Sequence, residues 1–154
     1  MDKTTKTVAI SGGFDPVHIG HIRLIKEASE LGDRLVVILN NDNWLIAKKG
    51  FAFMEEAERK EILLAMKYVD EVVITEHPER PTDMSVCAEL EKIKPDIFAN
   101  GGDRKPDGDP IPEVELCQRL RIELIYNIGH GGKVQSSSEL VKRVKEKGID
   151  PKTI

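Results

Sequence analysis

Cysteine is scarce in this sequence, with only Cys87 and Cys117 present. They lie far apart and fit neither a Cys-x-x-Cys pair nor a metal-ligand spacing, which argues against a zinc site and a dithiol redox centre. Each falls on the apolar face of a predicted helix. We therefore expect buried thiols in a reducing compartment, and neither a disulfide nor a nucleophile.

The sequence also lacks a long apolar run that could span a bilayer, and residues 1–6 are too polar for a signal-peptide core. Basic residues are not in excess, because 23 lysines and arginines stand against 27 acidic residues, with a formal net charge of −4. This balance argues against a nucleic-acid or membrane partner. We expect a cytoplasmic protein in which local cations meet any phosphate ligand.

At 154 residues the chain is long enough for a single self-sufficient domain, expected over 1–154 with flexible tails at 1–6 and 148–154. Strand and helix patterns alternate along it. Strands are expected at 7–11, 34–39, 71–75, 97–100 and 122–126, and helices at 19–31, 55–66, 84–93, 114–120 and about 137–147. This alternation predicts an α/β, Rossmann-like, doubly wound parallel sheet of about five strands with helices on both faces. Ligands of such sheets bind beyond the carboxyl ends of the strands.

Some local features carry expectations of their own. Gly32 is expected to cap the first helix, and residues 44–53 show no clear period. Ile62, Leu63 and Met66 are expected to face the core, and His77 is expected on the surface.

The stretch 8–31 organises the chain, because it predicts a strand, a glycine turn and a helix. Gly12 and Gly13 let the backbone approach a ligand closely, and the first N–H groups of a helix attract anions. His18 and His21 lie three positions apart, so both imidazoles can face one ligand, and Gly20 between them leaves room. The pattern predicts a phosphate-binding turn.

Residues 12–21 of this stretch read GGFDPVHIGH. The string resembles the GxFDxxHxGH signature of the cytidylyltransferase-like nucleotidyltransferases, a family that includes glycerol-3-phosphate cytidylyltransferase, heptose-phosphate adenylyltransferase domains and archaeal FAD synthetase. The matching positions are Gly13, Phe14, Asp15, His18, Gly20 and His21. The shorter HxGH string also occurs in class I aminoacyl-tRNA synthetases, but this chain is short for a synthetase and has no KMSKS-like lysine loop.

The resemblance implies roles for the residues of this turn. His18 and His21 would be catalytic and steady a triphosphate. Gly12, Gly13, Phe14, Asp15 and Gly20 would form the nucleotide-binding turn.

Cationic residues follow in the next loop and helix. The family places a lysine after the second strand and an arginine in an ExR-like segment, where they contact the triphosphate and the acceptor phosphate. Lys48 or Lys49, together with Arg59, occupy these positions and are the catalytic candidates. The sequence does not choose between the two lysines.

A further loop follows the fourth predicted strand, where residues 100–104 read NGGDR. It resembles the GGD segment of the heptose-phosphate adenylyltransferases and the GHD segment of the glycerol-phosphate enzymes. Gly102 would let the chain approach a base or ribose, and Asp103 would accept hydrogen bonds from it.

Serines precede the last predicted helix, where residues 135–140 read QSSSEL. The segment resembles an ISSTxIR-like motif that binds nucleotide phosphates, and Ser136, Ser137 and Ser138 match it. The sequence departs from the motif at Val141, where arginine is usual. His130 and Lys133 are candidates to replace that cation.

No serine, cysteine or lysine has a recognisable activating base in a motif, so no covalent catalysis is expected. The resemblance implies direct transfer of a nucleoside monophosphate to a small phosphorylated alcohol, polyol or sugar phosphate, or a phosphonate, with release of pyrophosphate. Mg²⁺ is the expected cofactor and would bridge the phosphate oxygens. No residue is assigned as a metal ligand.

CTP is the donor expected first, because the first part of the chain is closest to the glycerol-phosphate cytidylyltransferases. The GGDR string favours the alternative, an ATP-using adenylyltransferase of the heptose-phosphate, FAD-synthetase or pantetheine-phosphate type. A nucleotide-binding regulatory module without turnover is the alternative of another class. A dinucleotide-binding dehydrogenase is disfavoured, because the glycine turn lacks the GxGxxG spacing.

The family commonly forms dimers, so a homodimer is expected. Trp44, Phe51 and Phe53 could supply its apolar contact patch, and core packing explains them equally well.

Overall fold

The structure is a computed structural model that describes residues 5–101 and 112–128 of the chain. The expected site residues Gly102, Asp103, Ser136, Ser137 and Ser138 lie outside the described residues, as do the expected helix at about 137–147 and the candidates His130 and Lys133. The strands are β1 (Thr7–Gly12), β2 (Arg34–Leu39), β3 (Glu71–Ile74), β4 (Ile97–Gly101) and β5 (Glu123–Ile128). The helices are α1 (Ile19–Ser29), α2 (Asp42–Lys49), α3 (Glu56–Leu64), α4 (Cys87–Ile93) and α5 (Pro112–Leu120).

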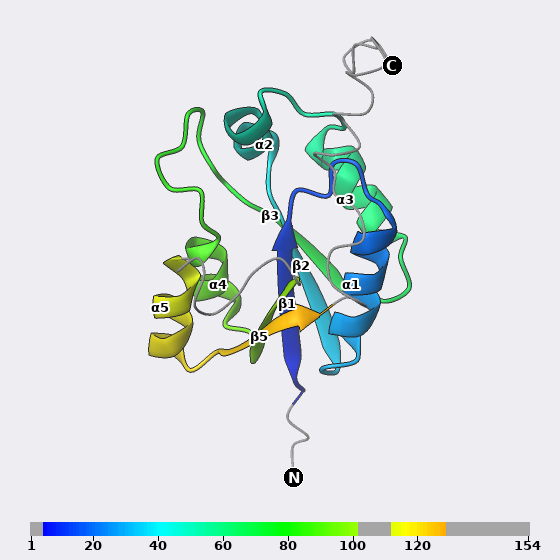
Figure 1. The fold of residues 1–154 in the computed structure, drawn as a ribbon, viewed down its shortest axis with the longest axis vertical. Helices are drawn as coiled ribbons and strands as arrows, with labels where there is room; N and C mark the ends of the chain where they lie inside the picture. The colour runs from blue at the N-terminus through cyan, green and yellow to red at the C-terminus, as the bar shows by residue number, and fades with distance from the viewer. Residues whose placement is uncertain (1–4, 102–111, 129–154) are drawn as a thin grey trace.

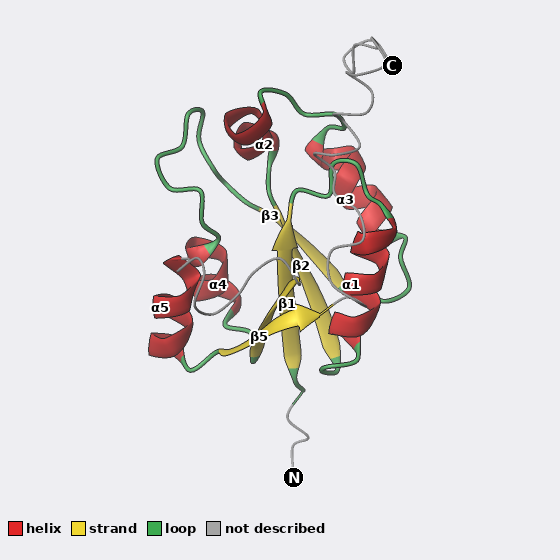
Figure 2. Ribbon diagram, in the orientation of Figure 1, coloured by secondary structure: helices red, strands yellow, loops and turns green. Residues whose placement is uncertain are grey.

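The strands form one parallel sheet in the order β3-β2-β1-β4-β5. Figure 1 shows α1 and α3 on one side of this sheet and α4 and α5 on the other, and the same layering is seen by secondary structure in Figure 2. The predicted doubly wound α/β fold is confirmed. The strand order reverses between β1 and β4, because the chain returns from edge strand β3 to the middle of the sheet.

A separate apolar core lies on each face of the sheet. Alternate strand residues supply the two cores, so Val8 and Ile10 pack towards α1 and α3, while Ala9 packs towards α4 and α5. β2 is covered on both faces, which explains its continuous apolar sequence. The two cores hold the carboxyl ends of β1 and β2 rigidly beneath the loops that leave them.

The helices differ from the predictions at points where one hydrogen bond or one side chain determines where a helix begins or which residue faces the core. α2 was not predicted, because it buries only Leu45 and so has no apolar period. It begins because the side chain of Asn41 accepts the N–H of Trp44 at 3.0 Å. The prediction that Ile62 faces the core is wrong, since its side chain is 39% exposed while Leu63 is buried.

The ends of α1 and α4 also fall elsewhere than expected. α1 stops at Ser29, so Gly32 does not cap it. Gly32 is required for close packing instead, because a Cβ there would lie 2.7 Å from the carbonyl oxygen of Lys6. α4 begins at Cys87 rather than at residue 84. No helix in the described part of the chain is long and apolar enough to cross a membrane.

Candidate functional site

The carboxyl ends of β1 and β2 define the candidate site. The glycine turn, residues 12–17, leaves β1 at this end, α1 begins just after it, and α2 follows β2 directly. Figure 1 shows α2 and the start of α1 beyond this end of the sheet. Ligands of doubly wound proteins bind where the strand order reverses, which is beside β1 here.

His18 and His21 form a reciprocal cap at the start of α1. Nδ1 of His18 accepts the N–H of Gly20 at 3.1 Å, and Nδ1 of His21 accepts the N–H of His18 at 3.2 Å. This is a capping box whose two side chains are both imidazoles. The rings stack with centroids 3.8 Å apart and planes tilted by 24°. The His-x-x-His spacing therefore serves the helix as well as the site.

The cap occupies backbone N–H groups that an anion would otherwise bind. The N–H of Gly20 is bound by His18, and the N–H of His21 donates to the carbonyl of His18 at 2.9 Å. These two helix-start amides are therefore not available for the phosphate contact that the sequence predicts.

The hydrogen bonds of the two rings determine where their protons lie. Each Nδ1 accepts a backbone N–H, so a neutral ring carries its proton on Nε2. Burial lowers the pKa of His21 to about 3, helped by the charges of His18 and Lys49. At neutral pH His21 is thus an uncharged donor through Nε2–H, a group suited to a phosphate oxygen.

The structure distinguishes the two lysines at the end of α2. Lys49 is half-buried, and its Nζ donates to the carbonyl oxygen of Asp15 at 3.3 Å. Burial lowers the pKa of Lys49, and Asp15 partly offsets this effect. Lys48 is exposed and lies over the ring of Trp44, 4.8 Å from its centroid. Lys49 is therefore the lysine that places charge beside the histidines.

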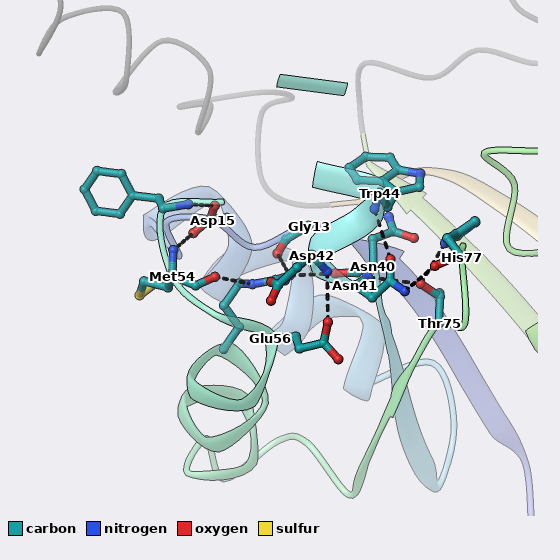
Figure 3. Close-up of polar contacts among 12 residues, drawn as sticks. Gly13, Asp15, Asn40, Asn41, Asp42, Trp44, Met54, Glu56, Thr75 and His77 are labelled. Atoms are coloured by element: carbon teal, nitrogen blue, oxygen red, sulfur yellow. Dashed lines mark hydrogen bonds and ion pairs between the residues drawn. The ribbon is translucent and has the colours of Figure 1, made fainter. Parts of the chain in front are cut away.

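Arg59 lies beneath the site rather than in it. Its side chain is wholly buried, with 0% exposure. The guanidinium donates to the carbonyl oxygens of Met54 (2.9 Å), Gly13 (2.8 Å) and Asn40 (2.6 Å), and it pairs with Asp42 at 2.7 Å. Figure 3 shows these partners converging. The expected contact of Arg59 with a phosphate does not fit this placement, because its donors are turned inward.

Asp15 and Phe14 also hold the turn together. The carboxylate of Asp15 is buried and accepts the N–H groups of Phe53 (2.5 Å) and Met54 (2.7 Å). Phe14 is part of the apolar core below the turn and packs against His21 with ring centroids 4.7 Å apart. The structure places both side chains in internal contacts, and their contact with a nucleotide stays a prediction.

The missing side chain of Gly13 makes room for α2. A Cβ at this position would lie 2.9 Å from Cδ2 of Leu45, the buried residue of that helix. At Gly12 a Cβ would lie 3.1 Å from the ring of Phe14. The glycines therefore allow close packing of protein on protein here.

A buried polar chain beside the site was missed from the sequence. Thr75 accepts the N–H of Asn41 at 3.0 Å and contacts Nδ1 of His77 at 2.8 Å, while Nε2 of His77 faces the carbonyl oxygen of Ser85 at 3.0 Å. The prediction of a surface position for His77 is wrong, because the residue is only 8% exposed. The signal available in the sequence was the run of polar residues directly after a buried strand.

One buried polar atom near the site is unpaired within the described residues. Oδ1 of Asn40 is buried and has no hydrogen-bond partner among the described residues. Asn40 follows β2, and its N–H donates to the carbonyl oxygen of Gly12 at 2.9 Å. An orphaned acceptor of this kind reduces stability.

Comparison with known proteins identifies the family of the chain. The model of the family described as cytidylyltransferase-like matches residues 9–126. The chain belongs to the cytidylyltransferase-like family. That assignment confirms the resemblance seen in the glycine turn, and it makes the chain a nucleotidyltransferase.

The relatives of this cytidylyltransferase-like chain include FAD synthases and a bifunctional protein. The FAD synthase of Pyrococcus abyssi is 36% identical over 145 residues, which cover 90% of this chain and 92% of that protein. The bifunctional protein HldE of Hydrogenovibrio crunogenus is 42% identical over 111 residues, covering 70% of this chain and 22% of that protein. The crystal structure of a lipopolysaccharide core biosynthesis protein from Thermoplasma volcanium superposes with a TM-score of 0.66 and 26% identity, covering 82% and 99%.

The metal-ligating side chains and the cysteines bear on whether the described residues form a metal site or supply a thiol nucleophile. Within residues 5–101 and 112–128, no group of three or more His, Cys, Asp or Glu side chains could hold a metal ion. Cys117 is buried, Cys87 is half-buried, and burial raises the pKa of Cys117 to about 11. Such a thiol is a poor nucleophile at neutral pH.

Proposed function

We propose that this chain is an ATP-using adenylyltransferase whose acceptor is FMN, so that its product is FAD. The FAD synthases support the acceptor, because they match this chain over nearly the whole length of both proteins. HldE, by contrast, shares only a minor part of its length with it. These relatives favour the adenylyl alternative over the CTP donor expected first.

In the proposed reaction a phosphate oxygen of FMN attacks the α-phosphorus of ATP. A new P–O bond forms while the bond to the β-phosphate oxygen breaks, and pyrophosphate leaves. No bond to the protein is formed. The protein aligns the two substrates and stabilises negative charge, which is how phosphoryl-type transfer is generally catalysed.

The arrangement of His18, His21 and Lys49 is the observation that carries this proposal. Nδ1 of each imidazole is bound to the backbone, and we propose that Nε2–H of His21 is a donor to the triphosphate. Because His21 stays neutral, it donates a hydrogen bond without moving a proton. The ammonium of Lys49 beside the turn supplies the positive charge that the leaving pyrophosphate requires.

The donor in this proposal is the magnesium complex of ATP. We propose that Mg²⁺ enters with the triphosphate, where it would offset the negative charge of the phosphates.

A donor-by-acceptor screen tests the proposal. The purified chain is incubated with Mg²⁺ and either ATP or CTP, against FMN, glycerol phosphate and a heptose phosphate, and the products are identified by mass spectrometry. We expect FAD and pyrophosphate from ATP with FMN. A CDP-alcohol from CTP would restore the donor expected first. No pyrophosphate from any pair would support a regulatory nucleotide-binding module.

A further inference from the structure

We propose that Arg59 and Asp15 are positioning residues that hold the segment 50–55 against the glycine turn and thereby keep the amino group of Lys49 beside the two histidines. The inference rests on the proposed function for its kinetic consequence, and on the hydrogen bonds of the two residues for its structural basis. Neither residue touches a substrate in this scheme. Both act through Lys49.

Arg59 joins three pieces of chain. Its guanidinium binds the turn at Gly13, the end of β2 and start of α2 at Asn40 and Asp42, and the segment 50–55 at Met54. These bonds point in different directions from one rigid planar group. A guanidinium can make such directed bonds, whereas an ammonium on a flexible stem cannot make them all together.

Asp15 closes the same junction from the turn. Its two carboxylate oxygens accept consecutive N–H groups, those of Phe53 and Met54. The segment 50–55 is therefore held at Met54 twice, by Asp15 through the N–H and by Arg59 through the carbonyl oxygen. A segment fixed on both sides of one residue has little freedom to move away from the turn.

These contacts position Lys49, because it is the last residue of α2. Gly50 ends the helix in the left-handed conformation, with φ of 91°, and the chain turns directly into the held segment. The ammonium then reaches back to the carbonyl oxygen of Asp15. A lysine side chain loses considerable rotamer freedom when it is fixed, so its position has to be imposed by the surrounding backbone.

The burial of Arg59 and Asp15 distinguishes a positioning role from direct contact with the substrate. The side chain of Arg59 is fully buried, and every guanidinium contact given above is internal. Asp15 is 1% exposed and engaged with backbone N–H groups. Loss of either residue should therefore act on the reaction by releasing Lys49, without loss of a direct substrate contact.

A double-mutant cycle tests this dependence. We expect Lys49→Ala to lower kcat for FAD formation about 100-fold, a typical loss for one charge-stabilising group, and Arg59→Lys to lower it nearly as much although the charge is kept. In the Lys49→Ala background, Arg59→Lys should cost less than about threefold more, because coupled residues are not additive. Equal losses in both backgrounds would overturn the proposal.

A matched control and a milder variant accompany the cycle. Arg34→Lys makes the same exchange in an exposed ion pair with Glu71, and we expect it to leave kcat unchanged. Asp15→Asn keeps the size of the side chain and weakens one side of the junction. If Arg59→Lys does not fold, Asp15→Asn takes its place in the cycle with the same expected non-additivity.

A second measurement needs no activity. The charge of Lys49 contributes to the lowered pKa of His21, so the NMR titration of the His21 ring reports whether the ammonium is in place. We expect the pKa of His21 to rise in Lys49→Ala, and to rise by a similar amount in Arg59→Lys. An unchanged His21 titration in Arg59→Lys would overturn the positioning role. If the native chain makes no FAD while this titration behaves as expected, the proposed function fails and the positioning role stands.

Discussion

The rings of His18 and His21 stack at 3.8 Å, and each turns its Nδ1 to a backbone N–H within the first turn of α1. The two histidines are thus held by the same bonds that begin the helix. The cap and the proposed phosphate-binding pair therefore use the same two side chains.

Replacing His21 should separate these two roles. Glutamine at the third helical position can preserve the capping box, so His21→Gln is expected to fold. It should lower kcat for FAD formation about 100-fold, because the imidazole Nε2–H is replaced by an amide N–H on a flexible side chain. The control is Ile22→Gln, an exposed position one residue further along α1, which should keep near-native turnover. Near-native turnover of His21→Gln would contradict the assigned role.

The stability of the fold should fall in mild acid because of His21. Its pKa is about 3 in the folded protein and 6.5 ordinarily, so between these values the unfolded chain binds a proton that the folded chain does not. The free energy of unfolding is therefore unaffected above pH 6.5 and falls below it, by at most about 1.4 kcal/mol per pH unit. Urea unfolding at pH 7, 6 and 5 measures the slope. His21→Gln should have a smaller slope over the same range, and an equal slope would argue against a buried neutral imidazole.

The two neighbouring lysines form a matched pair. Lys49→Ala should reduce kcat by about two orders of magnitude, since its ammonium lies at the turn. Lys48→Ala should change kcat by less than about twofold, because the exposed ammonium only covers the ring of Trp44. Steady-state kinetics with ATP and FMN distinguishes them. A larger effect at Lys48 would reverse the assignment.

The unpaired side-chain oxygen of Asn40 predicts that substitution of this residue increases the stability of the fold. Asn40→Leu replaces a buried acceptor that has no partner in the described part of the chain with an apolar side chain of similar size. Removing the unmet acceptor should raise the free energy of unfolding by about 1 kcal/mol. Thermal unfolding of the chain without substrates measures it. Asn41→Leu is the contrast, because Asn41 caps α2 and binds the carbonyl oxygen of His77, and it should destabilise the fold.

Much of the fold followed from the sequence because its signals are local. The apolar run of β2 and the alternation of strands and helices predict a doubly wound sheet without knowledge of any contact. The glycine turn and the histidine pair were found because a contiguous motif carries them. Near-neighbour hydrogen bonds of the kind made by His18 and His21 leave a fixed spacing in the sequence.

The rest depends on contacts between segments far apart in the chain. Arg59 has the residue type of a phosphate ligand, and only the three-dimensional structure shows that its donors bind Gly13 and Asn40 from below. In the sequence His77 resembles a loop histidine. Only the structure shows that it follows β3 and that its carbonyl oxygen accepts a hydrogen bond from Asn41. The choice between Lys48 and Lys49 required the unpredicted helix α2, since its geometry turns the two side chains in different directions.

The close approach of Leu45 to Gly13 links the glycine turn to the position of α2. A Cβ at position 13 would lie 2.9 Å from Cδ2 of Leu45, so a side chain there requires Leu45 to shift. A redesign that needs a larger residue in the turn should therefore shorten Leu45 at the same time. We expect the combined volume of positions 13 and 45 to set how closely α2 approaches the glycine turn.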